Sequence, residues 1–129
     1  MTSNQFRILI GCYLACVVLA ILGHVFTAEQ LPVALRDYVK TADQSTWMAS
    51  WVGVTYLVAA TASTIGLMIF KAWARPSFAL LAVFGAMPWD GHTVYPALEY
   101  LFINLEFMLA GAIVAAAYWA PVRSRFGNF

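Results

Sequence analysis

The chain of 129 residues has room for one domain (1–129), and 63% of its residues are hydrophobic whereas only 10% are charged. A soluble domain usually carries about 25% charged residues, so this chain has too little polar surface for water and is predicted to lie in a membrane. The net charge of +1, with no cluster of more than two or three Lys or Arg, excludes a polybasic nucleic-acid-binding protein.

An almost uncharged apolar run over 8–26 predicts the first transmembrane helix, because a bilayer core about 30 Å thick needs about 20 helical residues. The run is long for the core of a signal peptide, and Phe26 is too bulky for the nearby cleavage position, so we interpret it as a retained span. Cys12 and Cys16 lie one turn apart on one face of this helix. We expect them to act as small packing residues, because this spacing rarely allows disulfide geometry.

The next segment carries a helical pattern of its own. Apolar residues recur at helical spacing between positions 31 and 42, with the charged side chains away from the apolar face. This pattern predicts a short amphipathic helix in the first outer loop, with Pro32 near its start. Such a helix would lie on the membrane surface or cap the bundle.

Three further apolar runs follow, over 47–70, 74–89 and 97–120. The first and last are long enough to cross a bilayer, whereas the run over 74–89 is short for a span. Pro76 suits the first turn of that short helix. The sequence therefore predicts an all-α integral membrane protein with four transmembrane helices in an antiparallel bundle.

The distribution of charge predicts the orientation of these helices. The outer segments hold two basic and four acidic residues, whereas the segments on the side of the termini hold five basic residues. Because short cytoplasmic loops are rich in Lys and Arg, we expect both termini in the cytoplasm and the chain in a bacterial inner membrane. The five tryptophans fall near predicted helix ends, as an aromatic belt requires. The five basic residues are Arg7, Lys71, Arg75, Arg123 and Arg125.

Glu106 is the most informative polar residue, because it lies near the middle of the last span, where a charge costs about 2.5 kcal/mol or more. We expect its carboxyl to be protonated and hydrogen-bonded. Glu99, seven residues earlier, lies on nearly the same face and Asn104 on an adjoining one. Glu106 would join helices, within the chain or to another subunit, or titrate on a proton or ion path. The side chains expected at similar depth are Thr55, Thr61, Tyr13, Cys16 and Asn104.

A second polar group is predicted at the outer end of the bundle. Asp90 and His92 lie between the third and fourth helices, where they would line a shallow outward-facing pocket with Glu99 and His24, or form a solvated turn in which Asp90 caps a helix. Two histidines on different helices could ligate the iron of a haem, and histidine together with carboxylates could ligate a divalent ion. Neither group has a distinctive spacing here, so we expect no cofactor.

Two boundary segments stand out: Trp73-Ala74-Arg75, and Tyr118-Trp119-Ala120-Pro121 followed by Arg125-Phe126. They resemble those of short, uncharacterised bacterial inner-membrane proteins, in which helix 2 ends in an aromatic–Ala–Arg turn and helix 4 closes with an aromatic pair, a small residue, Pro and a basic–Phe tail. The resemblance implies a four-helix fold and nothing about activity.

The sequence contains no nucleophile elbow, phosphate-binding glycine loop or HExxH motif. We therefore expect a non-catalytic multi-pass protein that binds another membrane protein, as an accessory subunit or as an inhibitor of the immunity type. One alternative is a small oligomeric proton-coupled or ion-conducting transporter that uses Glu106. Another is an outward-facing membrane enzyme, or a haem or metal site, at Asp90, His92 and Glu99. The expected partners are the lipid bilayer and another membrane protein or a second copy, with no nucleic acid.

Overall fold

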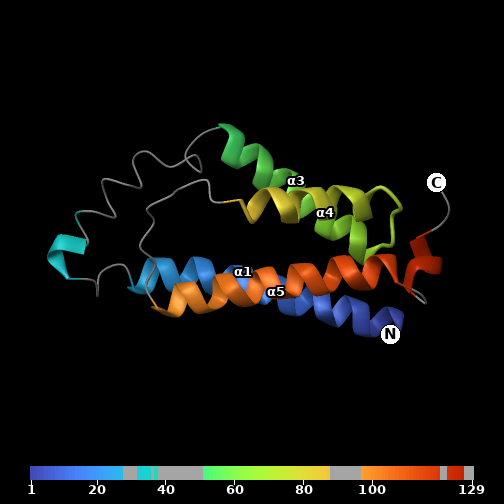
Figure 1. The fold of residues 1–129 in the computed structure, drawn as a ribbon, viewed down its shortest axis with the longest axis horizontal. Coiled ribbons are helices and arrows are strands. Elements are labelled where there is room, and N and C mark those ends of the chain that lie inside the picture. Colours follow the sequence, from blue (N-terminus) through green and yellow to red (C-terminus); the bar gives the residue numbers. More distant parts are fainter. Residues whose placement is uncertain (28–31, 36, 38–50, 88–96, 120–121, 127–129) are drawn as a thin grey trace.

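The described part of the chain consists of helices, two of which are joined by a short turn at one end of the molecule (Figure 1). This computed structural model describes residues 1–27, 32–35, 37, 51–87, 97–119 and 122–126, and no strand occurs among them. The elements are α1 (Ser3–Thr27), α3 (Trp51–Met68), α4 (Ala74–Gly85), α5 (Ala97–Tyr118) and the short 3-10 helix η3 (Val122–Phe126).

Three of these helices are long and apolar enough to cross a membrane: α1 through its Ser3–Gly23 part, α3 and α5. The helix expected over 74–89 is described as helical only from Ala74 to Gly85. At 1.5 Å per residue its 12 residues cover about 18 Å, which is short for a bilayer core about 30 Å thick. The all-helical character of the prediction is therefore confirmed, and the described residues provide three candidate spans.

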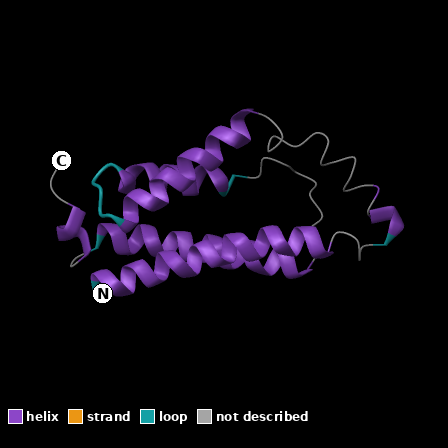
Figure 2. Ribbon diagram, turned by 180° about the vertical axis from the view of Figure 1, so that it is seen from behind, coloured by secondary structure: helices purple, strands orange, loops and turns teal. Residues whose placement is uncertain are grey.

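Helices α1 and α5 run antiparallel, side by side, and α3 and α4 form a hairpin above them (Figures 1 and 2). The two pairs meet at the end that holds the N-terminus, the α3–α4 turn and η3, which we call the closed end. The large buried side chains gather there, and many apolar side chains elsewhere on the spans are exposed, as suits a surface facing lipid. The largest fully buried ones are Phe6, Phe126, Ile10, Leu67 and Ile113.

Helix α1 starts five residues before the apolar run that predicted it, because a capping box fixes its first turn. The backbone N–H of Gln5 donates to Oγ1 of Thr2 at 3.2 Å, and the backbone N–H of Thr2 donates to Oε1 of Gln5 at 2.8 Å. The two side chains thereby satisfy two backbone donors that a helix start leaves free. Polar residues Ser3 and Asn4 consequently belong to the helix.

The turn between α3 and α4 is tight because of the backbone conformation of Phe70 and the absence of a side chain at Gly66. Phe70 adopts a left-handed backbone conformation with φ of 57°, and the N–H of Lys71 donates to the carbonyl of Gly66 at 2.8 Å. With the bond from Phe70 N–H to Leu67 O at 3.1 Å, this is a Schellman motif. A Cβ on Gly66 would stand 2.7 Å from Cβ of Ala74, so glycine allows the close return of α4.

Aromatic rings and arginines fill the closed end. The ring of Phe126 lies 5.9 Å from that of Phe6 and 5.2 Å from that of Phe70. The guanidinium of Arg75 lies 5.1 Å from the Phe126 ring, and that of Arg7 lies 5.3 Å from the Phe70 ring, both within cation–π range. Phe126 is only 2% exposed, so η3 packs as part of the core. We call Phe6, Phe70 and Phe126 the aromatic cluster.

The amphipathic helix expected in the first outer loop falls mostly outside the described residues. Within them, Val33–Leu35 and Asp37 are helical, and the N–H of Leu35 donates to the carbonyl of Pro32 at 2.9 Å. A helical turn thus begins at Pro32, as the position of that proline predicts. The remainder of that helix stays a prediction.

Candidate functional site

Glu106 lies between α1 and α5, half-buried, and its bond partner is Tyr13. The hydroxyl of Tyr13 donates to Oε1 of Glu106 with an O–O distance of 3.4 Å, long for such a bond. The Tyr13 ring also packs edge-on against Phe78 of α4, with centroids 5.6 Å apart. One tyrosine therefore links the carboxyl on α5 to both α1 and α4.

Tyr56 of α3 completes the polar cluster in the middle of the molecule. It lies close enough to Glu106 and Tyr13 to interact with both electrostatically. Its hydroxyl donates to the backbone carbonyl of Leu81 on α4 at 3.4 Å. We call Tyr13, Tyr56 and Glu106 the central polar cluster; its members come from three helices.

Glu99 lies two turns from Glu106 in the first turn of α5 and is only 6% exposed. It packs against α1, because a Cβ on Gly23 would stand 3.6 Å from Cα of Glu99. The N-terminal position suits a carboxylate, since the helix dipole favours negative charge there. Both acidic residues of α5 thus face α1, as their spacing of seven predicts.

Asn104 faces the other way. It is exposed, and its Nδ2–H donates to the carbonyl of Tyr100 one turn earlier at 2.7 Å. Thr55 behaves similarly, donating its hydroxyl to the carbonyl of Trp51 at 2.7 Å. Of the side chains expected near Glu106, Tyr13 makes the hydrogen bond, whereas Thr55 and Asn104 bond to their own helices.

The predicted outer cluster is placed only in part. Asp90 and His92 lie outside the described residues; His24 belongs to α1, but its side chain is not described. Among the residues that the structure does describe, no three His, Cys, Asp or Glu side chains gather in a way that could hold a metal ion. The haem, metal and outward-facing enzyme alternatives therefore stay predictions.

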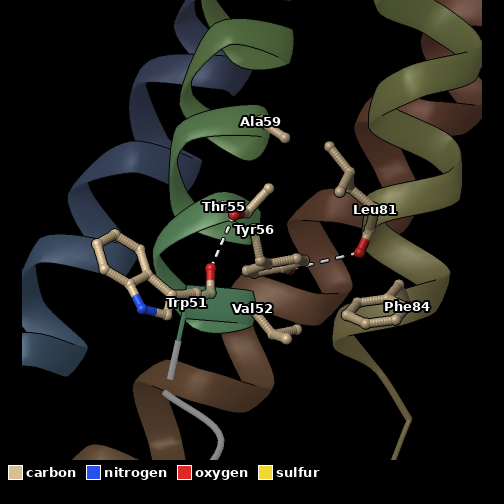
Figure 3. A pocket seen from close by; sticks show the side chains of 7 residues that line it. All are labelled: Trp51, Val52, Thr55, Tyr56, Ala59, Leu81 and Phe84. Atoms are coloured by element: carbon tan, nitrogen blue, oxygen red, sulfur yellow. Dashed lines mark hydrogen bonds between the residues drawn. The ribbon is translucent and has the colours of Figure 1, made fainter. Parts of the chain in front are cut away.

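A groove of about 400 Å³ opens between α3 and α4 (Figure 3). Five of its residues come from α3, and Leu81 and Phe84 face them from α4. The rings of Tyr56 and Phe84 lie 5.7 Å apart and tilted by 33°, so they line its floor together. The α3 residues are Trp51, Val52, Thr55, Tyr56 and Ala59.

Gly85 lets Tyr56 reach across this groove. A Cβ at position 85 would collide with the Tyr56 hydroxyl, which donates to Leu81 O in the same turn of α4. The sequence did not indicate the groove, since neither lining stretch holds a recognisable motif. Lys71, between two apolar runs, indicates a turn that returns α4 alongside α3, but it does not indicate a groove between them.

Compared with known protein families, with curated proteins and with solved structures, the chain has no significant match.

Proposed function

We propose that this chain is a non-catalytic multi-pass membrane protein that binds an apolar helix of another membrane protein in the groove between α3 and α4. The observation that supports it is the groove itself: a cavity of about 400 Å³ whose lining is almost entirely apolar, on the exposed side of a candidate span. A partner seated there would make the chain an accessory subunit or an inhibitor of that partner.

The chemistry of the groove suits a helix. Helices associate in lipid through close packing of side chains and small residues, because lipid provides no hydrophobic drive. Ala59 supplies a small residue in the wall, and Val52, 55% exposed, a rim that the partner would cover. The hydroxyls of Thr55 and Tyr56 both donate to backbone carbonyls. Because these donors are already used within the chain, an apolar ligand fits the groove better than a polar one.

Contacts within the chain fix the relative positions of α3 and α4, so the groove is preformed. The Tyr56–Leu81 hydrogen bond and the Tyr56–Phe84 ring contact join its two walls, and the Schellman turn at Phe70 fixes the hairpin at its other end. A preformed site avoids the entropy cost of ordering its own side chains on binding. A groove with a fixed shape favours binding of one partner helix over unspecific contact with lipid.

The same proposal includes a bacterial inner-membrane location, a bundle completed by α4, and both termini in the cytoplasm. The closed end carries Arg7, Arg75 and the basic residues of η3, and Figure 1 places the N-terminus, the α3–α4 turn and η3 together there. Five basic residues at one end of the helices match the rule that cytoplasmic ends are basic. Exposed Trp51 is the first residue of α3, and exposed Trp119 directly follows the end of α5; an aromatic belt places tryptophan at such helix ends.

Photo-crosslinking in native membranes tests the partner. A photoreactive phenylalanine at Ala59 or Leu81 is expected to give one product of defined mass with a second membrane protein. The same residue at Ile65 of α3 or Val83 of α4, 54% and 63% exposed and outside the groove lining, is the matched control and should give none. Adding Ala59→Trp, which fills the groove, should abolish the product formed from position 81.

Products with lipid alone from the groove positions would contradict the proposal. So would the same protein product from positions 59, 65, 81 and 83 alike, because contact would then not depend on the groove.

A proton-coupled or ion-conducting role for Glu106 is the second candidate. The observation in its favour is the central polar cluster, in which the Glu106 carboxyl meets a tyrosine hydroxyl from α1 and lies near another from α3. Glu106→Gln separates the two functions. The amide keeps the hydrogen-bonding capacity, so binding in the groove should survive, whereas proton transfer needs a titrating carboxyl. Proton flux in proteoliposomes that Glu106→Gln leaves unchanged would refute this second role.

A further inference from the structure

The exposed face of α5 carries a polar side chain in the part of the helix that crosses the membrane. Asn104 lies about 5 Å from the midpoint of α5 (Ala97–Tyr118), at 1.5 Å per residue. Its one described hydrogen bond runs from Nδ2–H to Tyr100 O. A carboxamide offers two N–H donors and an acceptor oxygen, so one N–H and the oxygen have no described bond.

Asn104 points away from the rest of the chain. It precedes Glu106 by two residues, so the two lie about 200° apart around the helix at roughly 100° per residue. Glu106 faces Tyr13 and α1, and Asn104 therefore occupies the side of α5 that no other described helix covers. Lipid tails cannot satisfy a polar group at this depth, which makes an unpaired carboxamide costly there.

We propose that Asn104 pairs with Asn104 of a second copy of this chain, so that two α5 helices lie side by side in the membrane. A partner must present a donor and an acceptor at the depth of Asn104. A second copy inserted in the same orientation does this by symmetry, because a two-fold axis along the membrane normal places equal residues at equal depth. A carboxamide is complementary to itself, since each copy donates one N–H and accepts at its oxygen.

The surroundings of Asn104 allow this approach. Gly111, seven residues later on the same face, has open space where a Cβ would stand, so it is not needed for packing within the chain and leaves room for a neighbouring helix. Met108 between them is 72% exposed. Both acidic residues of α5 face α1, so no like charges oppose each other across the pair. This face is separate from the α3–α4 groove, so self-association goes beyond the proposed function and does not depend on it.

Energy transfer between labelled copies of the full chain in proteoliposomes tests the pairing. Donor and acceptor dyes on Lys71→Cys, in a background with Cys12→Ala and Cys16→Ala, are diluted with lipid to obtain the association constant. We expect Asn104→Leu, which removes both hydrogen bonds of the pair, to weaken association about tenfold, because the two bonds together contribute about 1.4 kcal/mol within a membrane. Asn104→Gln keeps donor and acceptor and should retain most of the association.

Leu80→Ala is the matched control, because Leu80 is 72% exposed on α4 and should leave the association constant unchanged. Helical content by circular dichroism checks that each variant folds. An absence of energy transfer at any lipid dilution, or a wild-type association constant for Asn104→Leu, would overturn the proposal. Ala59→Trp should leave the transfer intact, and Asn104→Leu should leave the groove crosslink intact, so the two proposals fail separately.

Discussion

The hydroxyl of Tyr13 on α1 donates a hydrogen bond to the carboxyl of Glu106 on α5, with the two oxygens 3.4 Å apart. The two residues are 93 positions apart in the chain and come from two candidate spans. A carboxyl in a candidate span therefore has a partner inside the same molecule. This contact is a polar link between α1 and α5 and gives the first prediction.

Removing the Tyr13 hydroxyl should weaken the fold slightly. Tyr13→Phe keeps the ring against Phe78 and leaves the Glu106 carboxyl without its donor, so we expect unfolding to become easier by about 1 kcal/mol or less, the usual value of a hydrogen bond within a membrane. Reversible unfolding in mixed detergent micelles measures it. Tyr100→Phe, on the exposed side of α5, is the control and should have no effect; equal losses in both variants would argue against the contact.

The two glycines Gly66 and Gly11 should respond oppositely to alanine. A Cβ at position 66 would stand 2.7 Å from that of Ala74, whereas a Cβ at position 11 meets nothing within 4 Å. Gly66→Ala is therefore expected to push α4 away and destabilise the chain by about 1–3 kcal/mol through overpacking. Gly11→Ala should be neutral or stabilising, because alanine forms helix better than glycine. Thermal unfolding in detergent compares them, and a tolerated Gly66→Ala would contradict the tight turn.

Phe70 combines backbone strain with a structural side chain. Its φ of 57° costs a non-glycine residue about 1 kcal/mol or more, and its ring packs against Phe6 and Phe126. Phe70→Ala loses the packing and keeps the strain, whereas Phe70→Gly loses the packing and relieves the strain. We expect both variants to be less stable than the wild type, with Phe70→Gly about 1 kcal/mol more stable than Phe70→Ala. The opposite order in denaturant titrations would mean that position 70 is not left-handed.

The C-terminal 3-10 helix should act as part of the core. Phe126→Ala removes a ring that contacts Phe6, Phe70 and the Arg75 guanidinium, so we expect a loss of about 3 kcal/mol. Arg123→Ala in the same helix changes an exposed side chain and should cost little. Limited proteolysis of the C-terminus measures the difference: cleavage should speed up in Phe126→Ala alone. Equal rates in both variants would show that η3 does not hold the closed end.

Much of the fold follows from local sequence patterns. The apolar runs over 8–26 and 97–120 correspond to α1 and α5, and the heptad spacing of Glu99 and Glu106 correctly places both on one face of α5. The early start of α1 was missed because the prediction followed hydrophobicity, whereas the Thr2–Gln5 capping box depends on hydrogen bonding. That signal was present in the sequence.

Contacts between distant residues could not be predicted in the same way. Tyr13 was one of several side chains expected at the depth of Glu106, and depth alone does not select among them. The burial of Phe126 and the groove beside Tyr56 both depend on how the α3–α4 hairpin meets α1 and α5. Helix faces in lipid are apolar on all sides, so a hydrophobic pattern cannot indicate which faces meet.

Cysteine labelling in intact cells tests the central claim, that the chain crosses a membrane with its closed end inside. In a background with Cys12→Ala and Cys16→Ala, single cysteines are introduced as Asp37→Cys and Lys71→Cys, both exposed positions, and treated with a membrane-impermeant maleimide. We expect Asp37→Cys to react in intact cells and Lys71→Cys to react only after permeabilisation. Labelling of Lys71→Cys in intact cells, to the extent seen after permeabilisation, would contradict it.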